Sequence, residues 1–178
     1  YFYADGYGKE SLILNLDDKG YDKHGDLYFT ACLLSFYQQL WLWDTHRDKI
    51  RDFNIEKPLW VFVGNSVSGG SWSKDEEVMA TDVAKILLFL ADFLQHPREA
   101  QRRIKQLVQE SGEETGIIGG NNEDIFKGSF TYLERAMATG KDAAALYTDV
   151  LRLLFNHAAG GTLRLPLPRG RATSWPSR

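Results

Sequence analysis

Residues 58–71 read PLWVFVGNSVSGGS, an apolar run followed at once by a loop of glycine, asparagine and serine. A continuous apolar run bounded by turn residues is typical of a strand in a parallel sheet that is covered on both faces. A capping box formed by Ser73 and Glu76 then predicts a helix. The stretch therefore predicts one strand–loop–helix unit of an α/β sheet. If Val61 lies in a buried strand, its replacement by Asp should unfold the domain.

The loop after this strand partly matches the P-loop pattern G-x-x-x-x-G-K-[ST]. Gly64, Gly69 and Ser71 fit, but Gly70 stands where the pattern requires lysine. A P-loop helix also begins at once, so that its N-terminus faces the phosphates, whereas the Ser73 cap places this helix start later. The pattern therefore argues against an ATP-binding P-loop.

The same loop remains a candidate for another kind of phosphate contact. In α/β sheets, ligands bind beyond the carboxyl ends of the strands, and Gly64, Asn65 and Ser66 lie at such an end. Their small side chains allow close approach of a backbone, and their amides and hydroxyls can donate to phosphate oxygens. A plain connecting loop is the competing interpretation, and the residues alone leave both open.

Hydrophobic periodicity and turn residues predict a chain that is predominantly helical with a few parallel strands. Besides residues 58–64, we expect short strands at 10–16 and 162–165, and a polar loop at 17–26. Expected helices cover residues 27–43, the stretch from the Ser73 cap to Leu94, 97–110, one or two short helices within 124–138, and 142–157.

Composition limits the classes of function. Apolar residues make up 43% of the 178 residues, and the net charge is −3. This balance indicates a globular chain with a core and argues against a free-standing nucleic-acid-binding domain, which is usually basic. The single cysteine, Cys32, excludes an internal disulfide and favours the reducing cytoplasm. No apolar run is long enough to span a membrane, and the chain opens at Tyr1 in mid-pattern, which indicates a fragment.

Few residues carry recognisable site chemistry. The four histidines are scattered without metal-ligand spacing, so no metal site is expected, and no catalytic nucleophile motif occurs. Arg98, Arg102 and Lys105 fall on one face of the helix that follows Pro97. This face is either solvated or in contact with DNA phosphates or a partner.

Five long stretches resemble, in order, the DEAD/DEAH-type superfamily 2 helicase subunit of type III restriction enzymes and its relatives. They are YFYADGYGKESLILNL (1–16), YFTACLLSFYQQLWLW (28–43), NIEKPLWVFVG (54–64), TGIIGGNNEDIFKGSFTYL (115–133) and LYTDVLRLLFNHAAGGTLRL (146–165).

The resemblance implies a partial RecA-like fold divided at residue 56. Residues 1–56 would be the end of the first RecA-like lobe and the inter-lobe connector, and 57–165 the first part of the second lobe. Gly64, Asn65 and Ser66 would then follow the strand of helicase motif IV and contact the nucleic-acid backbone. Residues 166–178, rich in proline, arginine and serine, depart from the family and are expected to be disordered.

The catalytic signatures of that family are missing from the chain. It has no G-K-[ST], no D-E-A-H box and no S-A-T motif, so the chain alone should not hydrolyse ATP. The resemblance implies ATP and Mg²⁺ as cofactors of the intact protein only, with DNA and the modification methyltransferase subunit as partners. The expected function is thus a non-catalytic piece of a phage-defence helicase. The alternative is a truncated homologue that binds a protein partner through its aromatic helix.

Overall fold

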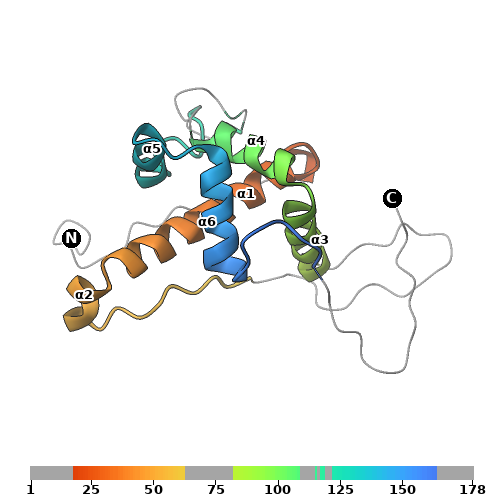
Figure 1. Cartoon of the computed structure of the whole chain (residues 1–178). Helices are drawn as coiled ribbons and strands as arrows, with labels where there is room; N and C mark the ends of the chain where they lie inside the picture. The colour runs from red at the N-terminus through yellow and green to blue at the C-terminus, as the bar shows by residue number, and fades with distance from the viewer. Residues whose placement is uncertain (1–17, 63–81, 109–114, 116, 119–121, 164–178) are drawn as a thin grey trace, which may run out of the picture.

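A computed structural model describes residues 18–62, 82–108, 115, 117–118 and 122–163 of the chain. This part is predominantly helical, as predicted (Figure 1). Its helices are α1 (Asp18–Thr45), α2 (Arg47–Ile50), the 3₁₀ helix η1 (Arg51–Phe53), α3 (Asp82–Gln95), α4 (Pro97–Val108), α5 (Thr131–Ala138) and α6 (Ala143–Phe155).

The long helix α1 begins earlier than the sequence predicted. Residues 18–26, expected as a polar loop, already belong to the helix. A glycine inside a helix costs only about 1 kcal/mol relative to alanine. Extending a helix that is already nucleated is easier than starting one. The buried turns from Leu27 onward can therefore nucleate the helix, which then extends over these polar residues. Near this end, the Thr30 hydroxyl donates to the Asp26 carbonyl at 2.6 Å.

Helix α4 lies at the centre of the core. It packs against α1, α3, α5 and α6. Helices α1 and α6 also pack against each other, and α6 crosses in front of α1 in Figure 1. On α4, Ala100, Ile104, Leu107 and Val108 are fully buried. The core residues that surround them are contributed by α1 (Leu33, Leu34, Tyr37), α3 (Phe89, Phe93), α5 (Leu133) and α6 (Leu146, Val150, Leu151).

The predicted last helix is confirmed, and its ends have identifiable causes. Asp142 caps α6 by accepting from the Ala145 amide at 2.8 Å. The helix ends at Asn156, which adopts the left-handed conformation (φ 50°), four residues before the glycine pair at 160–161. Gly160 has another role: a Cβ there would lie 2.7 Å from the Leu94 carbonyl oxygen. A side chain at this position would therefore push the chain after α6 away from the end of α3.

The predicted parallel strand at residues 58–64 is not seen in residues 58–62, the part of it that the structure describes. These residues form no regular secondary structure. Leu59 is 81% exposed and Val61 64% exposed. A strand needs a neighbour to satisfy its amides and carbonyls, and no strand lies beside this run in the described part of the chain. Instead, the Trp60 ring packs on Phe36, with 5.5 Å between ring centroids.

The described residues accordingly show no α/β sheet. Their one β pairing is an isolated antiparallel bridge between Ile118 and Asp124. The strand predicted at 10–16 lies outside the described residues, and residues 162–163 of the strand predicted at 162–165 are irregular. The division at residue 56 stays a prediction, while helices from both sides of it share one hydrophobic core.

The exposure of Val61 changes the expected effect of a charge at this position. Val61→Asp should alter the free energy of unfolding by no more than about 0.5 kcal/mol, because surface substitutions rarely do more. The matched control is Val150→Asp on α6, where the parent side chain is fully buried. This control should unfold the chain or destabilise it by several kcal/mol. Urea denaturation of both variants measures the difference, and a severe loss in Val61→Asp would restore the buried-strand interpretation.

Candidate functional site

The structure describes some of the predicted contact residues and not others. Gly64, Asn65 and Ser66 lie outside the described residues, so the predicted backbone contact of this loop stays a prediction. Arg98, Arg102 and Lys105 are described, and all three are exposed on α4. We call these three side chains the basic face of α4.

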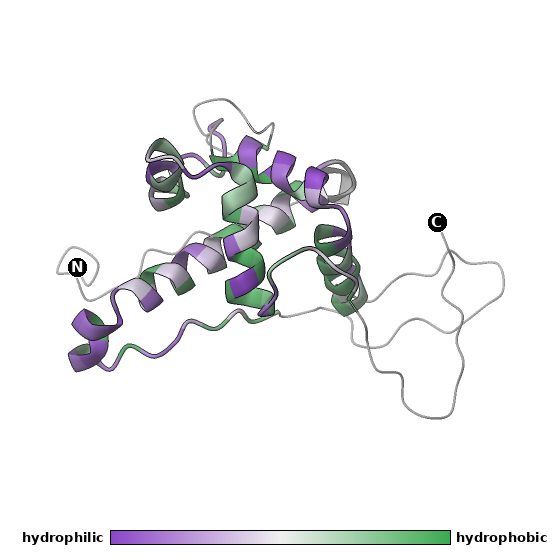
Figure 2. Ribbon diagram, in the orientation of Figure 1, coloured by the Kyte–Doolittle hydropathy of each residue, from purple (hydrophilic) through white to green (hydrophobic). Residues whose placement is uncertain are grey.

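The positive charge of the basic face is only partly neutralised by acidic side chains. Arg102 forms an ion pair with Glu99 on the same helix, at 2.9 Å. Within the described part of the chain, Arg98 and Lys105 form no ion pair. Figure 2 shows purple, hydrophilic turns along α4, whereas α3 is mostly green. The arrangement offers cationic hydrogen-bond donors to an external anion.

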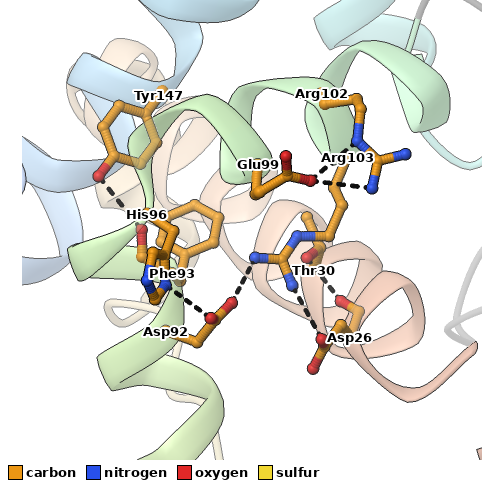
Figure 3. A network of polar contacts seen from close by, with 9 residues as sticks. All are labelled: Asp26, Thr30, Asp92, Phe93, His96, Glu99, Arg102, Arg103 and Tyr147. Carbon is orange, nitrogen blue, oxygen red and sulfur yellow. Dashed lines mark hydrogen bonds and ion pairs between the residues drawn. The ribbon is translucent and has the colours of Figure 1, made fainter.

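The third arginine of α4, Arg103, points the opposite way. Arg103 is buried, with its side chain 7% exposed, and it enters a polar network between α1, α3 and α4 (Figure 3). Its Nη2 donates to Asp92 Oδ2 of α3 at 2.7 Å, and its Nη1 lies 3.4 Å from Asp26 Oδ2 of α1. Asp92 Oδ1 in turn lies 2.8 Å from His96 Nδ1. We call Arg103, Asp92, Asp26 and His96 the Arg103 cluster.

The Arg103 cluster shifts the ionisation of Asp92. Partial burial alone would raise the pKa of this carboxyl, but the hydrogen bond and charge of Arg103 outweigh burial, with smaller contributions from His96. The pKa of Asp92 is therefore lowered from its usual value. The carboxylate form is favoured, as expected for the partner of a buried guanidinium.

The burial of Arg103 was not predicted, although the sequence carries a signal for it. The residue shares the buried side of α4 with Ala100, Ile104 and Leu107, so an arginine stands at a position where the helical pattern calls for an apolar residue. Buried arginines are almost always paired. That rule predicts an acidic partner somewhere, but it does not say that the partner is Asp92, the residue eleven positions earlier.

The chemistry of this cluster is structural rather than reactive. It contains no hydroxyl or thiol nucleophile, and both of its acids are engaged with Arg103. The half-buried Cys32 lies elsewhere on α1, and burial raises the pKa of its thiol despite an opposing hydrogen bond from Tyr28. A thiol with a raised pKa is mostly protonated at neutral pH and is therefore a poor nucleophile.

An open hollow of about 450 Å³ lies at the elbow between α1 and α2. The Arg47 guanidinium lies over the Trp43 ring, 4.3 Å from its centroid. The Trp43 indole also donates to the Ile55 carbonyl at 3.1 Å, which holds the chain after η1 against the end of α1. These contacts close one side of the hollow. Its lining combines both signs of charge: Trp43, Arg47, Asp48, Ile50, Arg51, Asn54, Ile55 and Glu56.

The chain from this elbow onward presents several apolar side chains to solvent. Residues 53–62 form what we call the apolar segment. Its exposed large hydrophobic side chains are Phe53, Ile55, Leu59, Val61 and Phe62. Trp60 anchors the segment on α1, and Phe62 packs on Trp60 with 4.4 Å between ring centroids. Clustered exposed apolar side chains are a feature of protein-binding surfaces.

Among the residues described, no three His, Cys, Asp or Glu side chains gather as a metal site would require. No helix in that part of the chain combines the length and the apolar character needed to cross a membrane.

Comparison with known proteins does not assign the chain to a family. No protein-family model, no curated protein and no solved structure shows a significant match to it.

The Arg103 cluster predicts a pH-dependent contribution to stability. The lowered pKa of Asp92 means that its ion pair stabilises the fold above the unfolded-state pKa of about 3.9 and is lost as the pH falls below it. Asp92→Asn should lower the free energy of unfolding by about 1–2 kcal/mol at neutral pH, because it removes the charge that neutralises the buried Arg103 guanidinium, while solvent screens part of the effect at the 39% exposed Asp92 carboxylate. The difference from the parent should shrink at about pH 3, because the carboxyl of the unfolded chain is then largely protonated and its ionisation on folding offsets part of the ion-pair energy. Urea titrations at both pH values measure it.

The exposed pair Glu99–Arg102 supplies the control. Because both side chains are largely exposed, Glu99→Gln should cost less than about 1 kcal/mol at either pH. If the cost of Asp92→Asn were the same at both pH values, the contribution of Asp92 would not come from its charge.

Proposed function

We propose that the chain is a piece of the DEAD/DEAH-type helicase subunit of a type III restriction system, and that it is not catalytic alone. The support is the ordered resemblance of its sequence, together with where the resembling stretches lie. Residues 28–43 fall in α1, and 146–155 fall in α6. These two helices supply much of the core around α4. These two stretches thus contribute many packing residues, which would specify a fold rather than a reaction.

The finer parts of this proposal follow from the resemblance. The chain would end the first RecA-like lobe and begin the second, and its parallel strands would pair in the context of the intact protein. ATP and Mg²⁺ would be bound by motifs that this sequence lacks. DNA and the modification methyltransferase subunit would be its partners in the cytoplasm, and Gly64, Asn65 and Ser66 would contact the DNA backbone.

A second function is favoured by a specific observation, the apolar segment. Leu59 and Val61 are more exposed than expected for members of a strand covered on both faces. Under the alternative proposal, this surface and the aromatic helix α1 beside it bind a protein partner in a truncated homologue that has no helicase activity. Burial of such apolar side chains would supply the association energy, at roughly 25 cal/mol per Å² before the costs of binding.

The length and motifs of the native polypeptide test the two proposals. An antibody raised against this chain should detect, in the cells that produce it, a polypeptide much larger than 20.3 kDa, the mass of the chain. Peptide mass spectrometry of that band should find a G-K-[ST] motif and a D-E-A-H-type box preceding Tyr1. A native band near the mass of the chain would contradict the helicase proposal and leave the interaction module.

A further inference from the structure

We propose that the basic face of α4 binds the phosphate backbone of a nucleic acid. This inference deepens the proposed function, on which it rests for the choice of nucleic acid as the ligand. It names three cationic side chains that make the contact, Arg98, Arg102 and Lys105. They are distinct from the loop at Gly64, Asn65 and Ser66.

The spacing of the three cations suits a regular row of phosphates. They follow one another by four and three residues and so lie along one side of the helix. With a rise of 1.5 Å per residue, Arg98 and Lys105 are about 10.5 Å apart along the axis of α4. One strand of a duplex carries a phosphate for about every 3.4 Å of its axis. The row of cations is therefore long enough to reach about two to three neighbouring phosphates of one strand.

The support beneath α4 holds this face in place. Ala100, Ile104, Leu107 and Val108 are fully buried on the opposite side of the helix, and Arg103 is tied to α1 and α3. Binding to a fixed helix costs less conformational entropy than binding to a flexible loop. The burial of Arg103 also separates two roles: this arginine is engaged in the core, whereas Arg102, its neighbour in sequence, points outward.

The side-chain chemistry of the basic face suits phosphate oxygens. Two of the three cations are arginines, whose planar guanidinium can donate two parallel hydrogen bonds to a phosphate. Arg98 also lies in the first turn of α4, where the helix dipole adds partial positive charge. Glu99 is the one acid within the row, and it leaves the face with a local charge of about +2. Because the whole chain carries −3, binding should be weak and strongly dependent on salt.

The test is the salt dependence of DNA binding by the 178-residue chain. Fluorescence anisotropy with a labelled duplex of mixed sequence is measured from about 50 to about 200 mM salt. In the triple variant Arg98→Gln, Arg102→Gln and Lys105→Gln, the slope of log K against log salt should become shallower by about 2 to 3, close to 0.9 per lost phosphate contact. Affinity should fall to a similar extent for unrelated DNA sequences, because phosphate contacts carry no base information.

The control is a triple variant with the same loss of charge, spread over the chain: Arg51→Gln, Lys57→Gln and Arg152→Gln. These three side chains are exposed on different segments, so the slope should hardly change. Both variants should melt near the parent temperature, because they alter only exposed side chains.

Three results would overturn the inference: no DNA binding by the parent at about 50 mM salt, an equal loss in both triple variants, or poly-glutamate binding to the basic face more tightly than DNA does. The last result would reassign the face to an acidic protein segment. The outcome is separable from that of the helicase proposal. If the basic face fails while the native polypeptide carries helicase motifs, that proposal stands and only this contact is lost.

Discussion

Arg103 brings a full positive charge into the interior of a small helical core, and the arrangement of three helices depends on its neutralisation. Removing a buried ion from water is costly unless its partners and hydrogen bonds are well placed. Asp92 reaches Arg103 from the last turns of α3, and Asp26 reaches it from the early turns of α1. A shift of either helix relative to α4 would remove one of the two ion pairs of the guanidinium. The cluster thus limits which packings of the three helices are stable.

This constraint is distinct from the hydrophobic energy of the core. Apolar burial is not directional, so the contacts of Ile104, Leu107 and Val108 stabilise many similar packings. The ion pairs select among them, because their distances tolerate little sliding. The same constraint gives α4 two unlike sides, a buried side that includes Arg103 and an outer side with cations available for binding. The proposed phosphate contact depends on that division.

The sequence predicted well those features that depend on local pattern. The start of α4 at Pro97, the body of α1 and the extent of α6 all follow from periodicity, caps and breakers. It predicted less well what depends on distant neighbours. Residues 58–62 have the composition of a buried strand, but a strand exists only where another strand pairs with it, and none of the described residues provides one. Likewise, Arg103 reads as one more basic residue until Asp92 and Asp26 are brought beside it.

The candidate site residues show the same difference between local pattern and distant neighbours. The basic face of α4 followed from helical spacing alone, and the structure places all three of its side chains in solvent. The loop residues Gly64, Asn65 and Ser66 were chosen because they follow a predicted strand. That choice therefore depends on a sheet whose strands are not seen in the described residues, and it stays a prediction.

The claim that Arg103 joins α1, α3 and α4 into one unit is tested most directly by native-state hydrogen exchange of Arg103→Met. Met removes the charge but keeps an unbranched apolar stem in the core. Core amides of α1, α3 and α4 should then lose protection together, by a common free energy of about 1–3 kcal/mol, because the hydrogen bond and ion pairs of Arg103 are lost while the remaining carboxylates stay partly solvated. Loss of protection in α4 alone, with α1 and α3 unchanged, would contradict this claim.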